Sequence, residues 1–189
     1  MKSIVVESLI RAPVEVVWEE TQNPVKHLNW DIRFSEIAYL NDQSLLYTTH
    51  LGFGLSIKGQ GRYLNTKEHG HSSFEFWSED PKSLLKMGKG IWIYETIGSE
   101  TYFKTVFDYD VNFGSSGKII DLIFRRLFCW ATEYSFELLR IKCETKADIN
   151  KKWSGFLIYV LKKPFQFSIK ARTFSWLGNG HKKFSKLKI

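Results

Sequence analysis

Cysteine and proline are scarce in this sequence, whose 189 residues contain two cysteines and four prolines. Cys129 and Cys143 lie fourteen residues apart on one predicted helix, which would separate them by roughly 21 Å. That distance is too long for a disulfide between them. The cysteine content therefore provides no disulfide framework and is typical of a protein from a reducing cytoplasm.

Long apolar runs are also missing. The N-terminal stretch 1–13 carries Glu7 and Arg11 where a signal peptide would need an unbroken apolar run. The longest apolar run near the C-terminus, residues 156–161, is far too short to span a bilayer. We therefore expect a cytoplasmic protein, with peripheral attachment to a membrane as an open alternative.

Motifs of the common nucleotide-binding and hydrolytic enzymes are absent from the sequence: it has no P-loop, no G-x-G-x-x-G and no G-x-S-x-G. His69 and His71 flank Gly70, but no cysteine or carboxylate lies beside them at a ligand-like spacing. A hairpin turn is thus favoured over a metal site there. The sequence predicts no metal, no cofactor and no assignable catalytic residue.

An apolar pattern of helical spacing runs through residues 115–145, a stretch without proline. Apolar residues recur every seven positions, with others between them: Ile120, Leu127, Tyr134 and Ile141, and Ile123, Trp130 and Leu138. This spacing predicts one helix over residues 118–144, about 40 Å long at ~1.5 Å per residue. Ser115 or Ser116 is expected to cap its first turn.

The face of this helix expected to point inward is its apolar stripe: Ile120, Ile123, Leu127, Trp130, Tyr134 and Leu138. A helical stripe of this kind fits an ordinary packed core. Bulky aromatic residues beside a strongly bent strand also fit the wall of an apolar ligand cavity. Both interpretations stay open at the level of the sequence.

The chain ahead of the long helix has the pattern of one strand, two short helices and then further strands. Lys2–Arg11 reads as the first strand, and Pro13 and Asn23-Pro24 are helix-start signals. The later strands are expected at Arg33–Leu40, Ser44–Leu51, Leu55–Asn65, Gly70–Ser78, Gly88–Ile97 and Tyr102–Phe113. Short loops favour antiparallel hairpins. We expect an α+β helix-grip fold, in which a curved antiparallel sheet of about seven strands wraps around the long helix.

Two features of the predicted strands bear on a cavity. The segment 55–63 alternates apolar or small residues with polar ones, and Gly59 and Gly61 on its apolar side allow bending or close approach. Trp92, Tyr94, Phe107 and Tyr109 occupy alternate positions of two neighbouring strands. Ile91, Ile93 and Glu95 face the other way, and either set can point inward.

Several local sequences, in this order, resemble the START and Bet v 1-like helix-grip superfamily, which includes the polyketide cyclases. They are Ile10–Trp18, Asn23-Pro24 to His27, Trp30-Asp31, Gly90–Tyr94, Phe107–Tyr109, Phe124–Leu127 and Trp130–Thr132. The last four look like an uncharacterised bacterial branch, and the resemblance covers about residues 3–144. It implies a hydrophobic cavity between sheet and helix, and in most members the binding or carriage of apolar molecules.

The leading functional hypothesis is accordingly the binding or carriage of a hydrophobic small molecule or lipid. The side chains expected to contact it are Leu55, Ile57, Phe74, Phe76, Trp92, Tyr94, Phe107, Tyr109, Leu127, Trp130 and Tyr134. A cyclase or aromatase would need a buried carboxylate, and Glu75, Glu95 and Asp108 are the candidates. A solvated outer face explains these three residues better. A third hypothesis is a membrane-surface or protein-interaction module with a filled cavity.

Charge divides the chain near Thr145. Residues 146–189 hold eleven Lys or Arg against Asp148 alone, a net charge of +10, whereas residues 1–145 hold sixteen against nineteen, a net charge of −3. We expect a helix-grip domain over 1–145 and a basic, aromatic-rich extension over 146–189. The extension could fold back on the domain, pair with a second copy in a homodimer, or bind an anionic membrane. Nucleic acid is the less favoured partner.

Overall fold

The computed structural model describes residues 3–41, 43–52, 55–147 and 153–162. Its elements, in chain order, are β1 (Ile4–Ile10), α1 (Val14–Gln22), α2 (Pro24–Trp30), β2 (Glu36–Tyr39), β3 (Ser44–Gly52), β4 (Leu55–Lys67), β5 (His71–Trp77), β6 (Leu85–Ile97), β7 (Glu100–Val111), α3 (Gly114–Thr145) and α4 (Trp153–Lys162).

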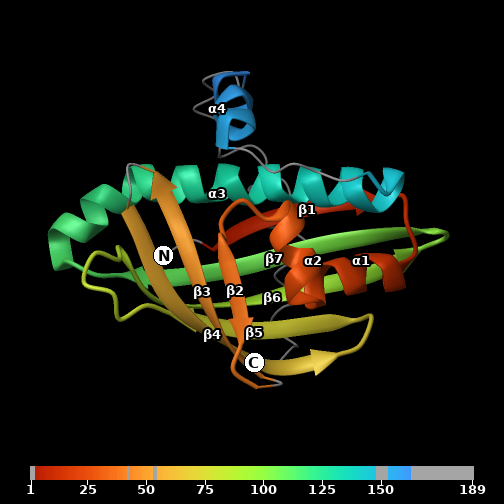
Figure 1. Cartoon of the computed structure of the whole chain (residues 1–189), viewed down its shortest axis with the longest axis horizontal. Coiled ribbons are helices and arrows are strands. Elements are labelled where there is room, and N and C mark those ends of the chain that lie inside the picture. The colour runs from red at the N-terminus through yellow and green to blue at the C-terminus, as the bar shows by residue number, and fades with distance from the viewer. Residues whose placement is uncertain (1–2, 42, 53–54, 148–152, 163–189) are drawn as a thin grey trace.

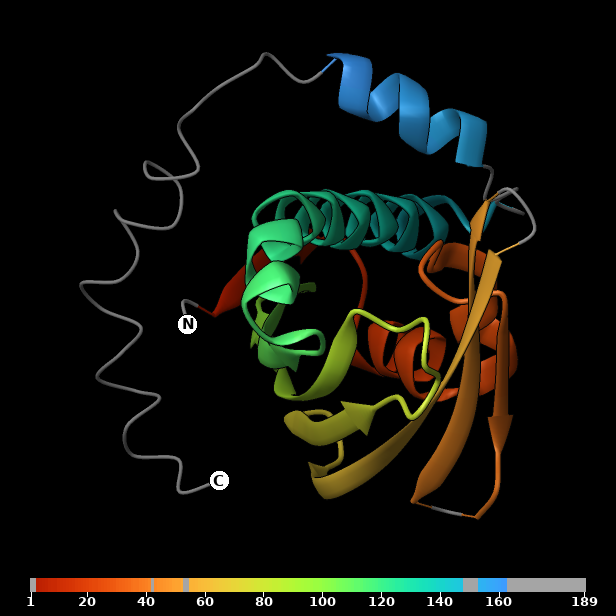
Figure 2. The same ribbon diagram turned by 90° about the vertical axis from the view of Figure 1, so that its left-hand side faces the viewer.

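All seven strands form one antiparallel sheet in the order β1-β7-β6-β5-β4-β3-β2. The sheet curves, and α3 lies along its concave side (Figures 1 and 2). The predicted α+β helix-grip fold is confirmed. Strands β2 to β7 pair with one another in chain order. Strand β1 pairs with β7, with Ile4 opposite Phe107 and Ile10 opposite Thr101.

The two short helices begin where the sequence signals predicted. The side chain of Asn23 caps α2 by accepting hydrogen bonds from the backbone N–H groups of Val25 (3.1 Å) and Lys26 (3.3 Å). Pro24 occupies the first helical turn, where its missing N–H costs nothing. Both short helices contact α3; α1 also contacts β6 and β7, and α2 contacts β2.

The start of α3 differs from the prediction. The helix begins at Gly114, and its N-cap is Phe113 in the left-handed conformation (φ 66°) without a side-chain cap. Ser116 instead donates to the carbonyl oxygen of Phe113 (2.8 Å), so neither serine caps the helix as predicted. At Gly117 a Cβ atom would lie 1.8 Å from the carbonyl oxygen of Asn112, which explains why this turn contains glycine.

The inward face of α3 also differs from the prediction. Ile120, Ile123 and Leu127 are 53%, 70% and 42% exposed and point away from the sheet. Of the six residues predicted to face inward, Leu138 is buried, and Trp130 and Tyr134 are half-buried. The residues buried on α3 are Gly117, Asp121, Ala131, Thr132, Ser135, Phe136, Leu138, Leu139 and Cys143. Hydrogen bonds satisfy their polar groups, so the face that packs on the protein contains many polar residues.

Aromatic rings fill the space between α3 and the sheet. Trp92, Tyr94, Phe107 and Tyr109 are buried on the concave face, which settles which side of β6 and β7 points inward. Ring contacts join the two layers, such as Phe103 stacked on Phe136 (4.7 Å between centroids). On β4, a Cβ atom at Gly59 would lie 2.2 Å from the ring of Tyr47. The predicted close approach at this glycine is therefore confirmed.

Within the C-terminal extension the structure describes residues 146–147 and α4. The helix α4 lies on the side of α3 that faces away from the sheet (Figures 1 and 2). Phe156 is buried, with its ring 5.9 Å from that of Tyr134 on α3. The rest of the predicted extension, residues 148–152 and 163–189, lies outside the described residues. Among the residues described, no helix is both long and apolar enough to cross a membrane.

Candidate functional site

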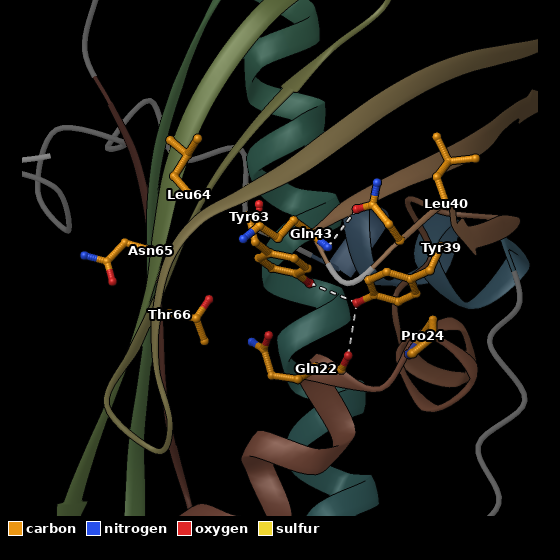
Figure 3. A pocket seen from close by; sticks show the side chains of 10 residues that line it. Gln22, Pro24, Tyr39, Leu40, Gln43, Tyr63, Leu64, Asn65 and Thr66 are labelled. Carbon is orange, nitrogen blue, oxygen red and sulfur yellow. Dashed lines mark hydrogen bonds between the residues drawn. The ribbon is translucent and has the colours of Figure 1, made fainter.

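A pocket of about 730 Å³ lies between the α1–α2 junction and the adjoining ends of β2, β3 and β4 (Figure 3). Its lining residues are Gln22, Pro24, Tyr39, Leu40, Asn41, Gln43, Tyr63, Leu64, Asn65 and Thr66. None of the ten carries a charge at neutral pH. The pocket therefore offers amide, hydroxyl and phenol groups together with apolar surface.

Local sequence signals build each wall of this pocket. The Asn23-Pro24 junction places Gln22 and Pro24 on one side. On the opposite side, Asn41 closes the β2–β3 turn by accepting from the backbone N–H groups of Gln43 (3.0 Å) and Ser44 (2.8 Å). The third wall contains a β-bulge, where the pairing of β4 with β5 shifts between Tyr63 and Asn65. Bulges of this kind re-aim side chains and are frequent beside functional sites.

Two tyrosines form the centre of the lining. The rings of Tyr39 and Tyr63 stack with centroids 6.4 Å apart and an interplanar angle of 17°. The Tyr39 hydroxyl donates to the backbone carbonyl of Gln22 (3.1 Å) and lies 3.4 Å from the Tyr63 hydroxyl (Figure 3). Burial raises the pKa of both phenols, and the neighbouring Tyr39 raises that of Tyr63 further. Both residues stay neutral at physiological pH and can exchange hydrogen bonds with a ligand.

Gln22 connects this pocket to the core. Its side-chain amide donates to the hydroxyl of Tyr94 (3.0 Å), which also lies 2.7 Å from the hydroxyl of Thr21. Tyr94 is buried, and that burial raises the pKa of its phenol although the bonds from Thr21 and Gln22 act against the rise. The inner wall of the pocket is thus held to β6 by neutral hydrogen bonds.

A second polar cluster lies in the interior, where the exit of α2 meets α3. The carboxylate of Asp31 is fully buried and accepts hydrogen bonds from Arg33 Nε (2.9 Å), His27 Nε2 (2.9 Å) and Ser135 Oγ (3.0 Å). Arg33 also donates to Thr132 (3.1 Å). Burial by itself would raise the pKa of Asp31, but the guanidinium and the hydrogen bonds from Arg33 and His27 outweigh it. The pKa therefore lies far below its usual range.

This interior cluster holds elements together. It joins the α2–β2 connection to the middle of α3, because Arg33 and Asp31 bind Thr132 and Ser135 across about a hundred residues of sequence. The side chains of Asp31 and His27 are 0% and 8% exposed. Because solvent does not reach this cluster and hydrogen-bond donors already saturate the carboxylate, its role is to stabilise the packing of α3 on the α2–β2 connection.

The residues predicted from the sequence to contact a ligand fall into three groups. Six of them come together on the concave face of β5 to β7, and we call them the inner ring cluster: Phe74, Phe76, Trp92, Tyr94, Phe107 and Tyr109. The ring centroids of Phe74 and Trp92 lie 5.3 Å apart, and those of Phe76 and Phe107 lie 6.4 Å apart. Leu55 and Ile57 lie on the same face of β4, since that face continues through Gly61, which pairs with Phe76.

The predicted residues of α3 are placed differently. Leu127 is exposed on the outer side of the helix, and Tyr134 contacts Phe156 of α4. Trp130 is half-buried. The first half of the stripe, Ile120 to Leu127, was assigned to the wrong side because hydrophobicity alone chose it, whereas Leu138 is buried and Trp130 and Tyr134 pack against the core. The inner face also uses the polar residues Asp121, Thr132 and Ser135.

The pocket lining was missed altogether by the sequence prediction. It consists mainly of polar residues at strand ends and turns, which periodicity cannot distinguish from ordinary loop residues. The signals that were present are the turn sequences Asn23-Pro24 and Asn41-Asp42, which mark two of its walls. Tyr94 is the predicted residue that reaches this wall, through Gln22.

The three candidate carboxylates lie away from the pocket and from the concave face. Glu95 and Asp108 are exposed, as an outer face requires. Glu75 is buried and accepts a hydrogen bond from Arg62 at 2.5 Å. Tyr109 on the inner face binds a different carboxylate, donating to Asp121 (2.6 Å). Among the described residues, no group of three or more His, Cys, Asp or Glu could hold a metal ion.

The proteins to which this chain is similar have names that state no activity. No protein-family model matches the sequence. An "Uncharacterized membrane protein YndG" of Bacillus subtilis (strain 168) is 37% identical over 170 residues, which are 84% of this chain and 63% of YndG. The chain therefore spans less than two thirds of the length of that relative.

Solved structures support the fold. A conserved protein from Geobacillus kaustophilus matches with a TM-score of 0.63 at 10% identity, covering 75% of this chain and 94% of that one. A protein from Thermus thermophilus matches with a TM-score of 0.60 at 12% identity, covering 75% and 96%. Identities this low show a shared fold alone.

Proposed function

We propose that this chain belongs to the START and Bet v 1-like superfamily and binds or carries a small, uncharged molecule with apolar and hydrogen-bonding parts. The observation that carries the proposal is the uncharged pocket between the α1–α2 junction and the ends of β2 to β4. Its volume of about 730 Å³ lies within the range of roughly 300–1,000 Å³ that is usual for small-molecule sites.

The chemistry of the lining selects the kind of ligand. The lining provides no charged side chain that could pair with a charged ligand, so it favours an uncharged one. The stacked rings of Tyr39 and Tyr63 provide a flat apolar surface, and their neutral hydroxyls give and accept hydrogen bonds. An alcohol, ketone, ester or amide on an apolar skeleton fits these groups.

The inner ring cluster supports the apolar half of the proposal. Phe74 and Phe76 are half-buried on the concave face, where Phe74 adjoins the buried ring of Trp92 and Phe76 adjoins the buried ring of Phe107. A ligand that displaced these half-buried rings would gain contact with aromatic surface close to α3. The residues proposed from the sequence, from Leu55 to Tyr109, thus remain candidates for the apolar contact region.

Carriage is proposed in preference to catalysis. A cyclase acting by proton transfer needs an acid or base within reach of its substrate, and none of the ten lining residues is a carboxylate, histidine or lysine. Asp31, which is buried in the interior, is already saturated by Arg33, His27 and Ser135.

Binding can be tested with the full-length chain and the uncharged fluorescent probe Nile red. Tyr63→Phe removes one hydroxyl from the lining while keeping the ring stack. The loss of one hydrogen bond should weaken Nile red binding by roughly three- to tenfold. Native mass spectrometry of protein from its own host should show a co-purifying uncharged molecule that the variant retains less well.

The matched control is Tyr102→Phe, which removes a phenol hydroxyl bonded to Glu7 (2.6 Å) away from the pocket. It should leave the affinity for Nile red unchanged. Equal effects of the two substitutions, or wild-type protein that binds neither Nile red nor any co-purifying molecule, would refute the proposed function.

A further inference from the structure

The first half of α3 exposes a continuous group of large aliphatic side chains. The exposed fractions of Ile119, Ile120, Leu122, Ile123 and Leu127 are 68%, 53%, 75%, 70% and 42%. All five lie within nine consecutive residues on the outer side of the helix. Isolated exposed aliphatics are normal on protein surfaces, whereas a contiguous patch of this kind marks an interaction site.

The helix α4 extends this patch. It lies on the same outer side of α3 (Figures 1 and 2), and its Leu157 and Ile158 are 59% and 53% exposed. Phe156 faces the other way and is buried near Tyr134. Together, the five side chains of α3 and these two of α4 form what we call the outer apolar surface.

Basic residues accompany the outer apolar surface. Lys118 and Arg126 lie among its α3 residues, and Arg125 is paired with Asp121 beneath them (3.1 Å). Asp121 is the sole acidic residue between positions 114 and 132, and it is buried. In the sequence, lysines adjoin α4 at both ends, and no acidic residue occurs from position 149 to 189.

We propose that the outer apolar surface docks this protein on an anionic lipid membrane, with the first half of α3 lying flat in the headgroup region. Interfacial helices combine an apolar face with Lys and Arg and immerse that face by about 5–10 Å. Each cation close to anionic lipid strengthens binding by about fivefold. This mode of attachment is independent of the pocket at β2–β4.

Two other partners could cover this surface: a second copy of the chain, or residues 163–189 of the same chain. Their charge makes both less suitable than an anionic membrane. In a symmetric dimer of this chain, Lys118 and Arg126 would approach the same basic surface of the second copy. Residues 163–189 hold seven Lys or Arg and no acidic residue, so folding them over this surface would also bring like charges together. An anionic lipid surface supplies the opposite charge along its whole extent.

The test uses sedimentation of the full-length chain with vesicles of phosphatidylcholine, with and without phosphatidylglycerol. Wild-type protein should sediment with the anionic vesicles, less so with neutral ones, and less so as salt is raised. The double variant Ile119→Gln/Ile123→Gln should bind anionic vesicles about tenfold more weakly or worse, because two aliphatic side chains no longer enter the interface. The matched control is Val25→Gln/Ile97→Gln, at sites 71% and 52% exposed on α2 and β6, which should bind as wild type.

A second variant keeps the proposal testable if the first one fails to fold. Lys118→Gln/Arg126→Gln removes two cations and leaves every aliphatic side chain of the outer apolar surface in place. It should weaken binding to anionic vesicles and leave binding to neutral vesicles unchanged. Wild-type protein that ignores anionic vesicles, or both double variants binding like wild type, would overturn the proposal. So would a dimer, seen by sedimentation velocity, that Ile119→Gln/Ile123→Gln dissociates while vesicle binding stays unchanged.

Discussion

Replacing Arg33 should show how much the interior polar cluster around Asp31 contributes to the stability of the fold. Its guanidinium donates to both carboxylate oxygens of Asp31, at 2.9 and 2.5 Å, and to Thr132 at 3.1 Å. The side chain of Asp31 is 0% exposed. Arg33→Met keeps much of the volume of the side chain and leaves this carboxylate buried without its main positive partner.

The size of the effect follows from that burial. Removing one partner of a buried ion pair destabilises a protein by about 3–5 kcal/mol, because the remaining charge is uncompensated. At roughly 2–4 °C per kcal/mol for a chain of this size, the unfolding temperature should fall by about 6–20 °C. Urea unfolding at pH 7 and thermal circular dichroism measure both quantities.

A double variant separates charge from packing. Arg33 also lies over the rings of Phe34 (5.5 Å) and Phe128 (5.9 Å), so part of the loss could come from these contacts. Arg33→Met/Asp31→Asn removes both charges and should be more stable than Arg33→Met alone, since no unpaired carboxylate remains. Arg140→Met is the control, because Arg140 pairs with Glu137 on the surface, where such pairs contribute about 0–1 kcal/mol.

The pH dependence gives an independent check. The pKa of Asp31 is lowered in the folded protein from an ordinary value of 3.8. Its contribution to stability is therefore complete well above pH 3.8 and is lost as the pH falls below that value. The stability difference between wild type and Asp31→Asn should shrink between pH 6 and pH 2. A double variant no more stable than Arg33→Met, together with a constant difference across this pH range, would refute the reasoning.

Two further changes test other parts of the fold. Gly117→Ala would place a Cβ atom 1.8 Å from the carbonyl oxygen of Asn112, so the β7–α3 connection must shift. Urea unfolding should show that the free energy of unfolding falls by about 1–3 kcal/mol. An unchanged free energy of unfolding would show that this turn is not tightly constrained. Burial raises the pKa of the Cys143 thiol to about 12. At pH 8 a maleimide should therefore label the half-buried Cys129 in the native protein and label Cys143 only after unfolding. Labelling of both cysteines at comparable rates in the native protein would contradict the burial of Cys143.

Much of the candidate site depends on contacts that a sequence does not display. Tyr39, Tyr63 and Gln22 meet because β2, β4 and the end of α1 converge, although their separations along the chain range from 17 to 41 residues. The lining is polar, so no hydrophobic period marked it. The concave aromatic residues of β6 and β7 were identified as one set from their alternation, but their direction was settled only when α3 covered that face.

The sequence by itself determined the order of the elements and most of their bounds. Period-two alternation is a property of each strand, and the Asn23-Pro24 cap acts within four residues, so both are visible locally. The uninterrupted helical pattern likewise determined one long α3, which extends four residues beyond its predicted start.

Tertiary structure decided which side of α3 is buried. Its outer side is the more hydrophobic over the first half, while Asp121, Thr132 and Ser135 are buried on the inner side. A buried polar residue is stable only when a partner satisfies it. Those partners are Tyr109 and Arg125 for Asp121, Arg33 for Thr132, and Asp31 for Ser135. Three of these bonds come from distant segments of the chain, and no periodic pattern within residues 114–145 could reveal them.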